Sequence, residues 1–97
     1  MTTITVTVRA EDVTFRARGH AEGDPAACAA VSALLWALAG YLDHHGGGCG
    51  QVGKGTAFLR VGRGTQAEHA AECILVGLLQ VERAAPHDVA VKVTPEA

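Results

Sequence analysis

A block of 17 consecutive residues without a charge constrains the fold of this chain more than any other feature. Residues 26–42 are almost entirely apolar, and seven of the 17 are Ala. This length is at the lower limit for a membrane-spanning helix, but Ala is only weakly apolar and no Lys or Arg flanks the block closely. We therefore expect a helix that is buried in a core or at a subunit contact, and no membrane span.

The residues on either side of this block predict where the helix begins and ends. Asp24 precedes Pro25, and Asp is a favoured N-cap because its carboxylate accepts a free backbone N–H. Pro suits the first helical position, where its missing N–H costs no hydrogen bond. Three glycines at 46–48 predict the end. We expect a helix over residues 25–44.

The chain before this helix alternates between apolar and polar residues. Residues 3–9 and 13–18 each place β-formers on one side and polar residues on the other, which is typical of half-buried strands. Residues 10–12 leave room only for a tight turn between them. We expect an antiparallel hairpin.

The second half of the chain repeats this organisation. Residues 49–52 and 56–61 predict a hairpin around a glycine turn. Thr65 and Glu68 have the spacing of a capping box, which predicts a second helix to about residue 85, followed by a strand over residues 88–94. The apolar residues expected to face the core are Ala67, Ala70, Ala71, Ile74, Leu75, Leu78 and Leu79 on the helix and Val89, Val91 and Val93 on the strand.

The expected order of elements is therefore ββαββαβ. A length of 97 residues suits one domain, residues 1–97, better than two. We predict an α+β fold in which a mostly antiparallel sheet packs with two helices.

Charge and cysteine content restrict the functional classes. The eight Lys and Arg residues are scattered along the sequence and the net charge is −2, so we expect no direct binding to nucleic acid. Three cysteines at long spacings indicate reduced thiols rather than a disulfide scaffold. With no signal peptide recognisable, we expect a cytoplasmic protein.

The residues with the clearest chemical potential are His20 and Cys28. They lie on either side of the predicted start of the first helix, where the positive end of the helix dipole favours a thiolate. A nearby imidazole can accept the thiol proton and so activate the nucleophile. The same residues also allow a structural interpretation, in which Cys28 is a small buried apolar residue and His20 stabilises a turn.

The wider pattern around these two residues resembles a known family. Gly19-His20-Ala21, then Asp24, then Cys-Ala-Ala-Val-Ser at 28–32 are similar to the signature of the ribosomal-processing cysteine protease family (Prp). The predicted order of elements matches that family over the whole chain. The resemblance implies a homodimeric cysteine endopeptidase that removes the N-terminal extension of a large-subunit ribosomal protein, cutting after aromatic residues, with a mobile loop over the site.

The resemblance also implies a role for each matched residue. Cys28 would be the nucleophile and His20 the general base, Gly19 would allow the turn that aims His20, and Ser32 would support the site. Asp24 is better explained as a helix cap than as a residue that orients His20. The gap between His20 and Cys28 is shorter than is usual in the family, which leaves the gating loop and the choice of substrate open.

Two other functions remain open from the sequence. A non-catalytic protein-binding module could keep the same fold. A zinc-binding domain is less favoured, because the candidate ligands lack the paired short spacing of zinc sites; they are His44, His45, Cys49, His69 and Cys73. We expect no cofactor and no metal.

Overall fold

The computed structural model describes residues 1–19 and 25–96. Along the chain it contains β1 (Thr2–Val8), β2 (Asp12–Arg18), α1 (Pro25–His45), β3 (Gly48–Gly53), β4 (Thr56–Gly62), α2 (Gln66–Ala84) and β5 (Val89–Pro95). The predicted order ββαββαβ is confirmed, as is the α+β class.

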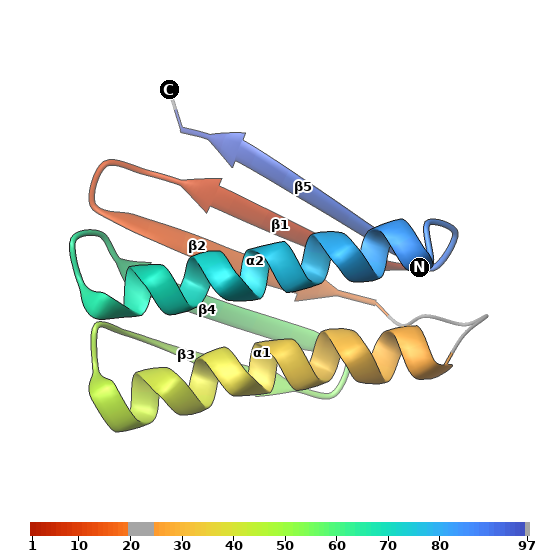
Figure 1. Cartoon of the computed structure of the whole chain (residues 1–97), viewed down its shortest axis with the longest axis horizontal. Coiled ribbons are helices and arrows are strands. Elements are labelled where there is room, and N and C mark those ends of the chain that lie inside the picture. The colour runs from red at the N-terminus through yellow and green to blue at the C-terminus, as the bar shows by residue number, and fades with distance from the viewer. Residues whose placement is uncertain (20–24, 97) are drawn as a thin grey trace.

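The strands form one five-stranded sheet in the order β3-β4-β2-β1-β5 (Figure 1). Three of the four neighbouring pairs are antiparallel. The exception is β5, which runs parallel to β1 at the edge of the sheet, with Val89 opposite Thr2. A parallel neighbour needs a crossover connection, and α2 supplies it.

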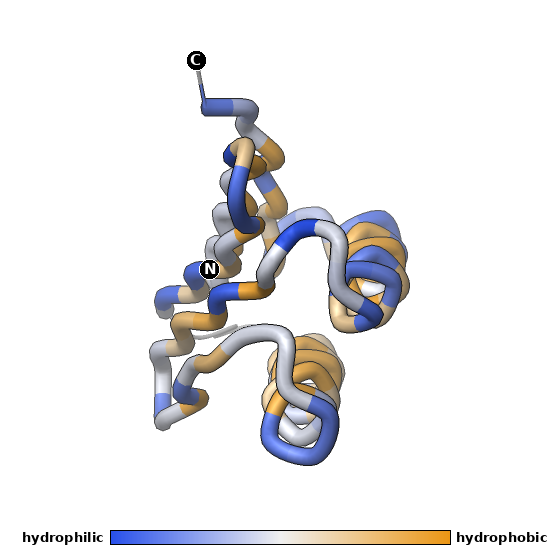
Figure 2. The backbone as a smooth tube through the Cα atoms, turned by 90° about the vertical axis from the view of Figure 1, so that its left-hand side faces the viewer, coloured by the Kyte–Doolittle hydropathy of each residue, from blue (hydrophilic) through white to orange (hydrophobic). Residues whose placement is uncertain are grey.

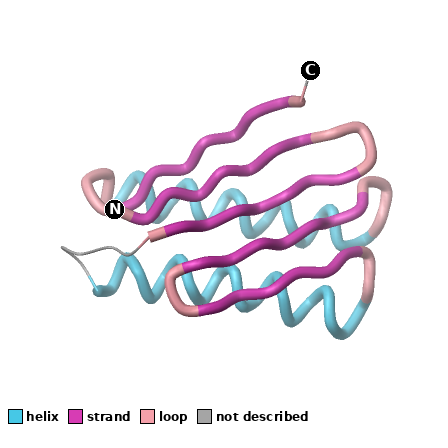
Figure 3. Tube along the Cα trace, turned by 180° about the vertical axis from the view of Figure 1, so that it is seen from behind, coloured by secondary structure: helices cyan, strands magenta, loops and turns pink. Residues whose placement is uncertain are grey.

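The molecule has two layers, because both helices cover the same face of the sheet (Figure 2). Apolar side chains from this face and from the helices form one core, in which the largest fully buried residues are Phe15, Ile4, Leu38, Leu59, Leu78, Val6, Val61 and Val89. The opposite face of the sheet carries no helix (Figure 3).

Helix α1 buries one stripe of side chains within this chain. The buried residues are Ala27, Val31, Leu35, Leu38 and Leu42. Trp36, in contrast, is 58% exposed. By length and composition α1 is the one helix among the described residues that could cross a membrane, but it packs along α2 and β3 as a helix of a core layer does.

The start of α2 differs from the predicted capping box. Thr65 is the N-cap, but its hydroxyl makes no cap hydrogen bond and instead donates to the Gly62 carbonyl at 2.8 Å. The Glu68 carboxylate accepts the N–H of Gly64 at 3.0 Å and an Arg63 N–H at 3.1 Å. The tight turn before the helix places the Gly64 N–H, rather than that of Thr65, within reach. These hydrogen bonds, that of Gly64 first, lower the pKa of Glu68.

Three residues expected in the core are more exposed than the sequence suggests. Val93 is 46% exposed, because the end of edge strand β5 lies away from α2 (Figure 1). Leu79 and Cys73 are exposed on α2. The mid-helix position of Cys73 among apolar residues predicts that it packs against the sheet, and this prediction is wrong, since the position faces outward on the helix.

Candidate active site

Cys28 lies in the first turn of α1, as the fourth residue of the helix. Its side chain is half-buried and packs against the edge of the core. The helix has no acidic residue in its first turn, so no carboxylate within the helix opposes a negative charge on sulfur at this end.

A narrow cavity of about 40 Å³ adjoins Cys28. It brings together three residues that the sequence singled out, Gly19, Cys28 and Ser32. The rest of its wall comes from β1, β2, α1 and the β3–β4 hairpin: Thr2, Ala17, Val31, Leu35, Val52, Gly53, Gly55 and Thr56. The volume suits one or two water-sized groups and not a large side chain.

Gly19 closes β2 in a conformation that other residues adopt with strain. Its φ is +91°, and a Cβ built there would lie 2.5 Å from the Met1 carbonyl oxygen. Its N–H donates to the Gly55 carbonyl at 3.1 Å. Gly19 therefore joins the end of β2 to the β3–β4 turn immediately before His20, as expected of a residue that sets the chain direction there.

His20 and Asp24 lie outside the described residues, as do residues 21–23, which belong to the segment where the resemblance implies a mobile loop over the site. The roles of base and helix cap therefore stay predictions.

The cavity wall opposite α1 contains residues that have no functional signal in the sequence. Thr2 is buried, and its hydroxyl has no hydrogen-bond partner among the described residues, so it leaves a polar group in the cavity wall. Gly53 and Gly55 were recognised as turn residues only. Their place beside Cys28 depends on strand pairing across the sheet, for which a local motif gives no signal.

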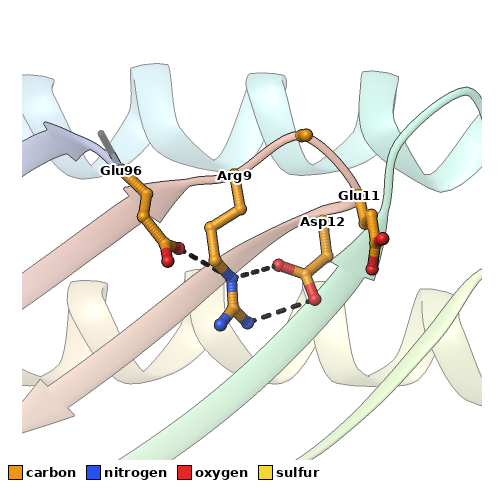
Figure 4. Close-up of a pocket in the computed structure, with 5 residues that line it drawn as sticks. Arg9, Glu11, Asp12 and Glu96 are labelled. Carbon is orange, nitrogen blue, oxygen red and sulfur yellow. Dashed lines mark hydrogen bonds and ion pairs between the residues drawn. The ribbon is translucent and has the colours of Figure 1, made fainter.

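A cavity of about 460 Å³ lies at the other end of β1 and β2. Arg9 donates to both carboxylate oxygens of Asp12, at 2.6 and 3.1 Å, and approaches Glu96 at 3.5 Å (Figure 4). Arg60 reaches Asp12 at 3.4 Å. The hydrogen bond from Arg9 is the main cause that lowers the pKa of Asp12. Among the described residues, no Cys, Ser, Thr or His lines this cavity, and the carboxylates of Asp12 and Glu96 are engaged by Arg9, so these residues form an ion-pair network rather than a second thiol-type site.

The candidate zinc ligands do not gather. Among residues 1–19 and 25–96, no group of three or more His, Cys, Asp or Glu side chains could hold a metal ion. His45 instead lies against the ring of Tyr41, with 4.5 Å between the ring centroids.

Comparison with known proteins gives a clear result for structures only. No family model and no curated protein matches the sequence. The ribosomal processing protease Prp from Staphylococcus aureus, with a covalently linked product peptide, matches with a TM-score of 0.78 and 19% identity over 97% of this chain and 100% of that one. This chain has the Prp fold. The Prp structure with a substrate peptide matches with a TM-score of 0.72 and 18% identity over the same shares.

The structure of SMU.848 from Streptococcus mutans also matches, with a TM-score of 0.77 and 20% identity over 99% of both chains. At these identities the likeness establishes the Prp fold for the whole chain. The chemistry has to be argued from the residues at the Cys28 cavity.

Proposed function

We propose that this chain is a Prp-like cysteine endopeptidase, with Cys28 as nucleophile and His20 as general base. The observation that carries the proposal is the position of Cys28: it lies in the first turn of α1 and shares one cavity with Gly19 and Ser32. These three residues belong to the motif that resembles the protease family, and the chain has the fold of a protease of that family.

The proposed reaction uses a single histidine for both proton transfers. His20 takes the proton from the Cys28 thiol, and the sulfur attacks the carbonyl carbon of the peptide bond. The C–N bond breaks as His20 gives the proton to the leaving amine, which leaves a thioester on Cys28. A water molecule then attacks the thioester while His20 takes its proton. The C–S bond breaks, the acid product leaves, and the proton returns to the thiol.

The size of the cavity restricts how a peptide binds. A volume of about 40 Å³ admits a carbonyl oxygen or a water. An aromatic side chain, after which the resembling family cuts, is far larger and would have to lie at the mouth of the cavity. Gly53, Gly55 and Thr56 of the β3–β4 hairpin line one side of the cavity, so we expect this hairpin to contact the substrate backbone.

The proposed substrate is the precursor of a large-subunit ribosomal protein, or another protein with an aromatic cleavage site. The two bound peptides of the S. aureus Prp structures support a protein substrate. A homodimer, which the resemblance implies, and a cytoplasmic location, which the odd number and long spacing of the cysteines favour, belong to the same proposal.

Peptide cleavage tests the proposal directly. The purified protein is incubated with a synthetic peptide that contains an aromatic pair, and mass spectrometry identifies the products. We expect cleavage after an aromatic residue, and loss of cleavage in both Cys28→Ser and His20→Ala. Cys73→Ser is the matched control, because Cys73 is exposed on α2 and should not affect the rate. A wild-type protein that binds the peptide without cutting it would instead support the binding-module alternative.

A further inference from the structure

The face of the sheet that carries no helix gathers most of the basic residues of the chain. Strand alternation directs Arg16 and Arg18 of β2, Arg60 of β4 and Lys92 of β5 to this face, and all four are exposed. With Arg9 beside them, five of the eight Lys and Arg residues lie on this side. In the sequence these residues are spread over more than 80 positions, and only strand pairing brings them together.

The register aligns part of this surface in one row across the sheet. Thr5 is opposite Arg16 on one side and Lys92 on the other. Arg16 is in turn opposite Phe58, and Phe58 is opposite Gln51. Neighbouring strands are about 4.8 Å apart, so the row presents a cation, a hydroxyl, a cation, an aromatic ring and an amide over about 19 Å.

Phe58 is the one aromatic residue on this face among the described residues, and it is 38% exposed. The Arg16 guanidinium lies over its ring, 5.0 Å from the centroid. This cation–π contact places the positive charge against the face of the aromatic ring. Such a pair suits a ligand that has both a planar ring and a phosphate.

The described acidic residues neutralise part of this surface and leave three of its cations unpaired. Asp12 and Glu96 lie beside it and are both engaged by Arg9 (Figure 4), and Asp12 also pairs with Arg60. Arg16, Arg18 and Lys92 have no ion-pair partner among the described residues. Four of the acidic residues, Asp43, Glu68, Glu72 and Glu82, lie on the helices. A chain with a net charge of −2 thus has one positive face.

We propose that this face, defined by Arg16, Arg18, Phe58, Arg60 and Lys92, binds single-stranded nucleic acid. The basic side chains would contact phosphates, which supply most of the affinity of such complexes. One base would stack on the flat surface that the Phe58 ring and the Arg16 guanidinium form together, an interaction that does not depend on the identity of the base. Sheets that present exposed aromatic residues are an established platform for unpaired bases.

Other occupants fit the surface less well. A second copy of this chain, packed by a two-fold axis, would bring like charges together. An acidic peptide would use the cations but would have no planar group for Phe58. An anionic membrane would have only Phe58 as an apolar anchor on the face.

Fluorescence anisotropy with a labelled oligouridylate tests the proposal. We expect a dissociation constant of about 10⁻⁴–10⁻⁶ M at physiological salt, weakening as salt rises. Arg18→Glu should weaken binding by at least about fivefold, whereas Arg83→Glu, the same charge change on α2, should have little effect. Phe58→Ala should weaken binding by about 5- to 100-fold, and Phe58→Leu should weaken it as well, while Phe58→Tyr should preserve it.

Each control separates the proposal from an alternative. Equal effects of Arg18→Glu and Arg83→Glu would overturn it, because binding would then follow net charge alone. Binding of polyglutamate or of phosphatidylserine vesicles as strong as that of RNA, with no effect of Phe58→Ala, would assign the face to an acidic protein or a membrane instead. A change of oligomeric mass in Arg18→Glu would assign it to self-association. Cys28→Ser should bind RNA normally, so this test does not depend on the proposed protease.

Discussion

The three cysteines are exposed to different degrees, and this makes their reactivity informative. Cys49 and Cys73 are exposed, whereas Cys28 is half-buried. Accessibility alone therefore predicts that Cys28 reacts last. Activation by His20 and the helix N-terminus predicts that it reacts first, because the thiolate is the reactive form. We expect substoichiometric iodoacetamide at neutral pH to label Cys28 first, as read by peptide mass spectrometry.

His20→Ala is the control for this labelling. It should slow the modification of Cys28 and leave the rates at Cys49 and Cys73 unchanged. If Cys49 or Cys73 is labelled first and His20→Ala changes nothing, Cys28 is a packing residue and the proposed protease is wrong.

Gly19 offers a test of how closely the site depends on backbone geometry. Gly19→Ala would place a Cβ at a positive φ and 2.5 Å from the Met1 carbonyl oxygen. We expect a loss of stability of about 1–3 kcal/mol in urea unfolding, together with slower labelling of Cys28. Gly40→Ala is the matched control, because a Cβ there meets nothing within 4 Å and should stabilise α1 by about 0.5–1 kcal/mol.

Asp12 provides a pH-dependent prediction. The Arg9 hydrogen bond lowers its pKa in the folded protein, so its contribution to stability is complete above the unfolded value of about 3.9. That contribution is lost as the pH falls through the lower, folded pKa. Asp12→Asn should therefore lower Tm near neutral pH, and the difference from wild type should shrink on acidification below about pH 4. A difference that stays constant down to strongly acidic pH would contradict this role.

We expect substitutions on the two faces of helix α1 to change the stability of the chain by very different amounts. Leu38 is fully buried in the core, and Trp36, two residues earlier, is 58% exposed. Leu38→Ala should cost about 2–5 kcal/mol, because it leaves a cavity in the core. Trp36→Ala should change the stability of the separate chain by less than about 0.5 kcal/mol. Urea unfolding at low protein concentration measures both, and a large loss for Trp36→Ala would contradict this assignment of faces.

The secondary structure elements could be predicted because their signals are local. Alternation in β1 and β2, and Asp24-Pro25 before α1, are read over a few residues. The structural predictions that were wrong concern features that depend on contacts between residues distant in the sequence. The turn before α2 places the Gly64 N–H within hydrogen-bond distance of the Glu68 carboxylate. Val93 is exposed because β5 pairs with β1 at the edge of the sheet, where α2 does not cover the end of the strand.

At the scale of the whole molecule, residues that meet only through strand pairing also could not be predicted from the sequence. Gly19, Cys28 and Ser32 could be selected from the sequence because they belong to one continuous motif. Thr2 and Gly55, which complete the cavity, could not, because they reach it through the β1 and β3–β4 positions in the sheet. The basic face was missed for the same reason: Arg16 and Lys92 are neighbours only through β1.

The outer side of α1 leads to the last prediction, which concerns oligomeric state. Ala29, Ser32, Ala33, Trp36 and Ala37 are exposed on one side of the helix, and no charged residue occurs from 25 to 42. Small side chains around one large aromatic residue let a second helix approach closely, and Trp is favoured at the centre of interfaces. We expect a homodimer in which this side of α1 packs on its copy.

Light scattering at tens of micromolar should give twice the mass of the chain, and Trp36→Arg should reduce it to that of a monomer, since a charge would be buried at the contact. Arg18→Glu, on the far side of the sheet, is the control that should leave the dimer intact. Ser32 belongs both to this surface and to the Cys28 cavity, so the monomeric variant should also cleave peptide more slowly. A monomeric mass for the wild-type protein would contradict the predicted dimer. Full peptidase activity in the monomeric Trp36→Arg variant would show that the active site does not depend on dimerisation.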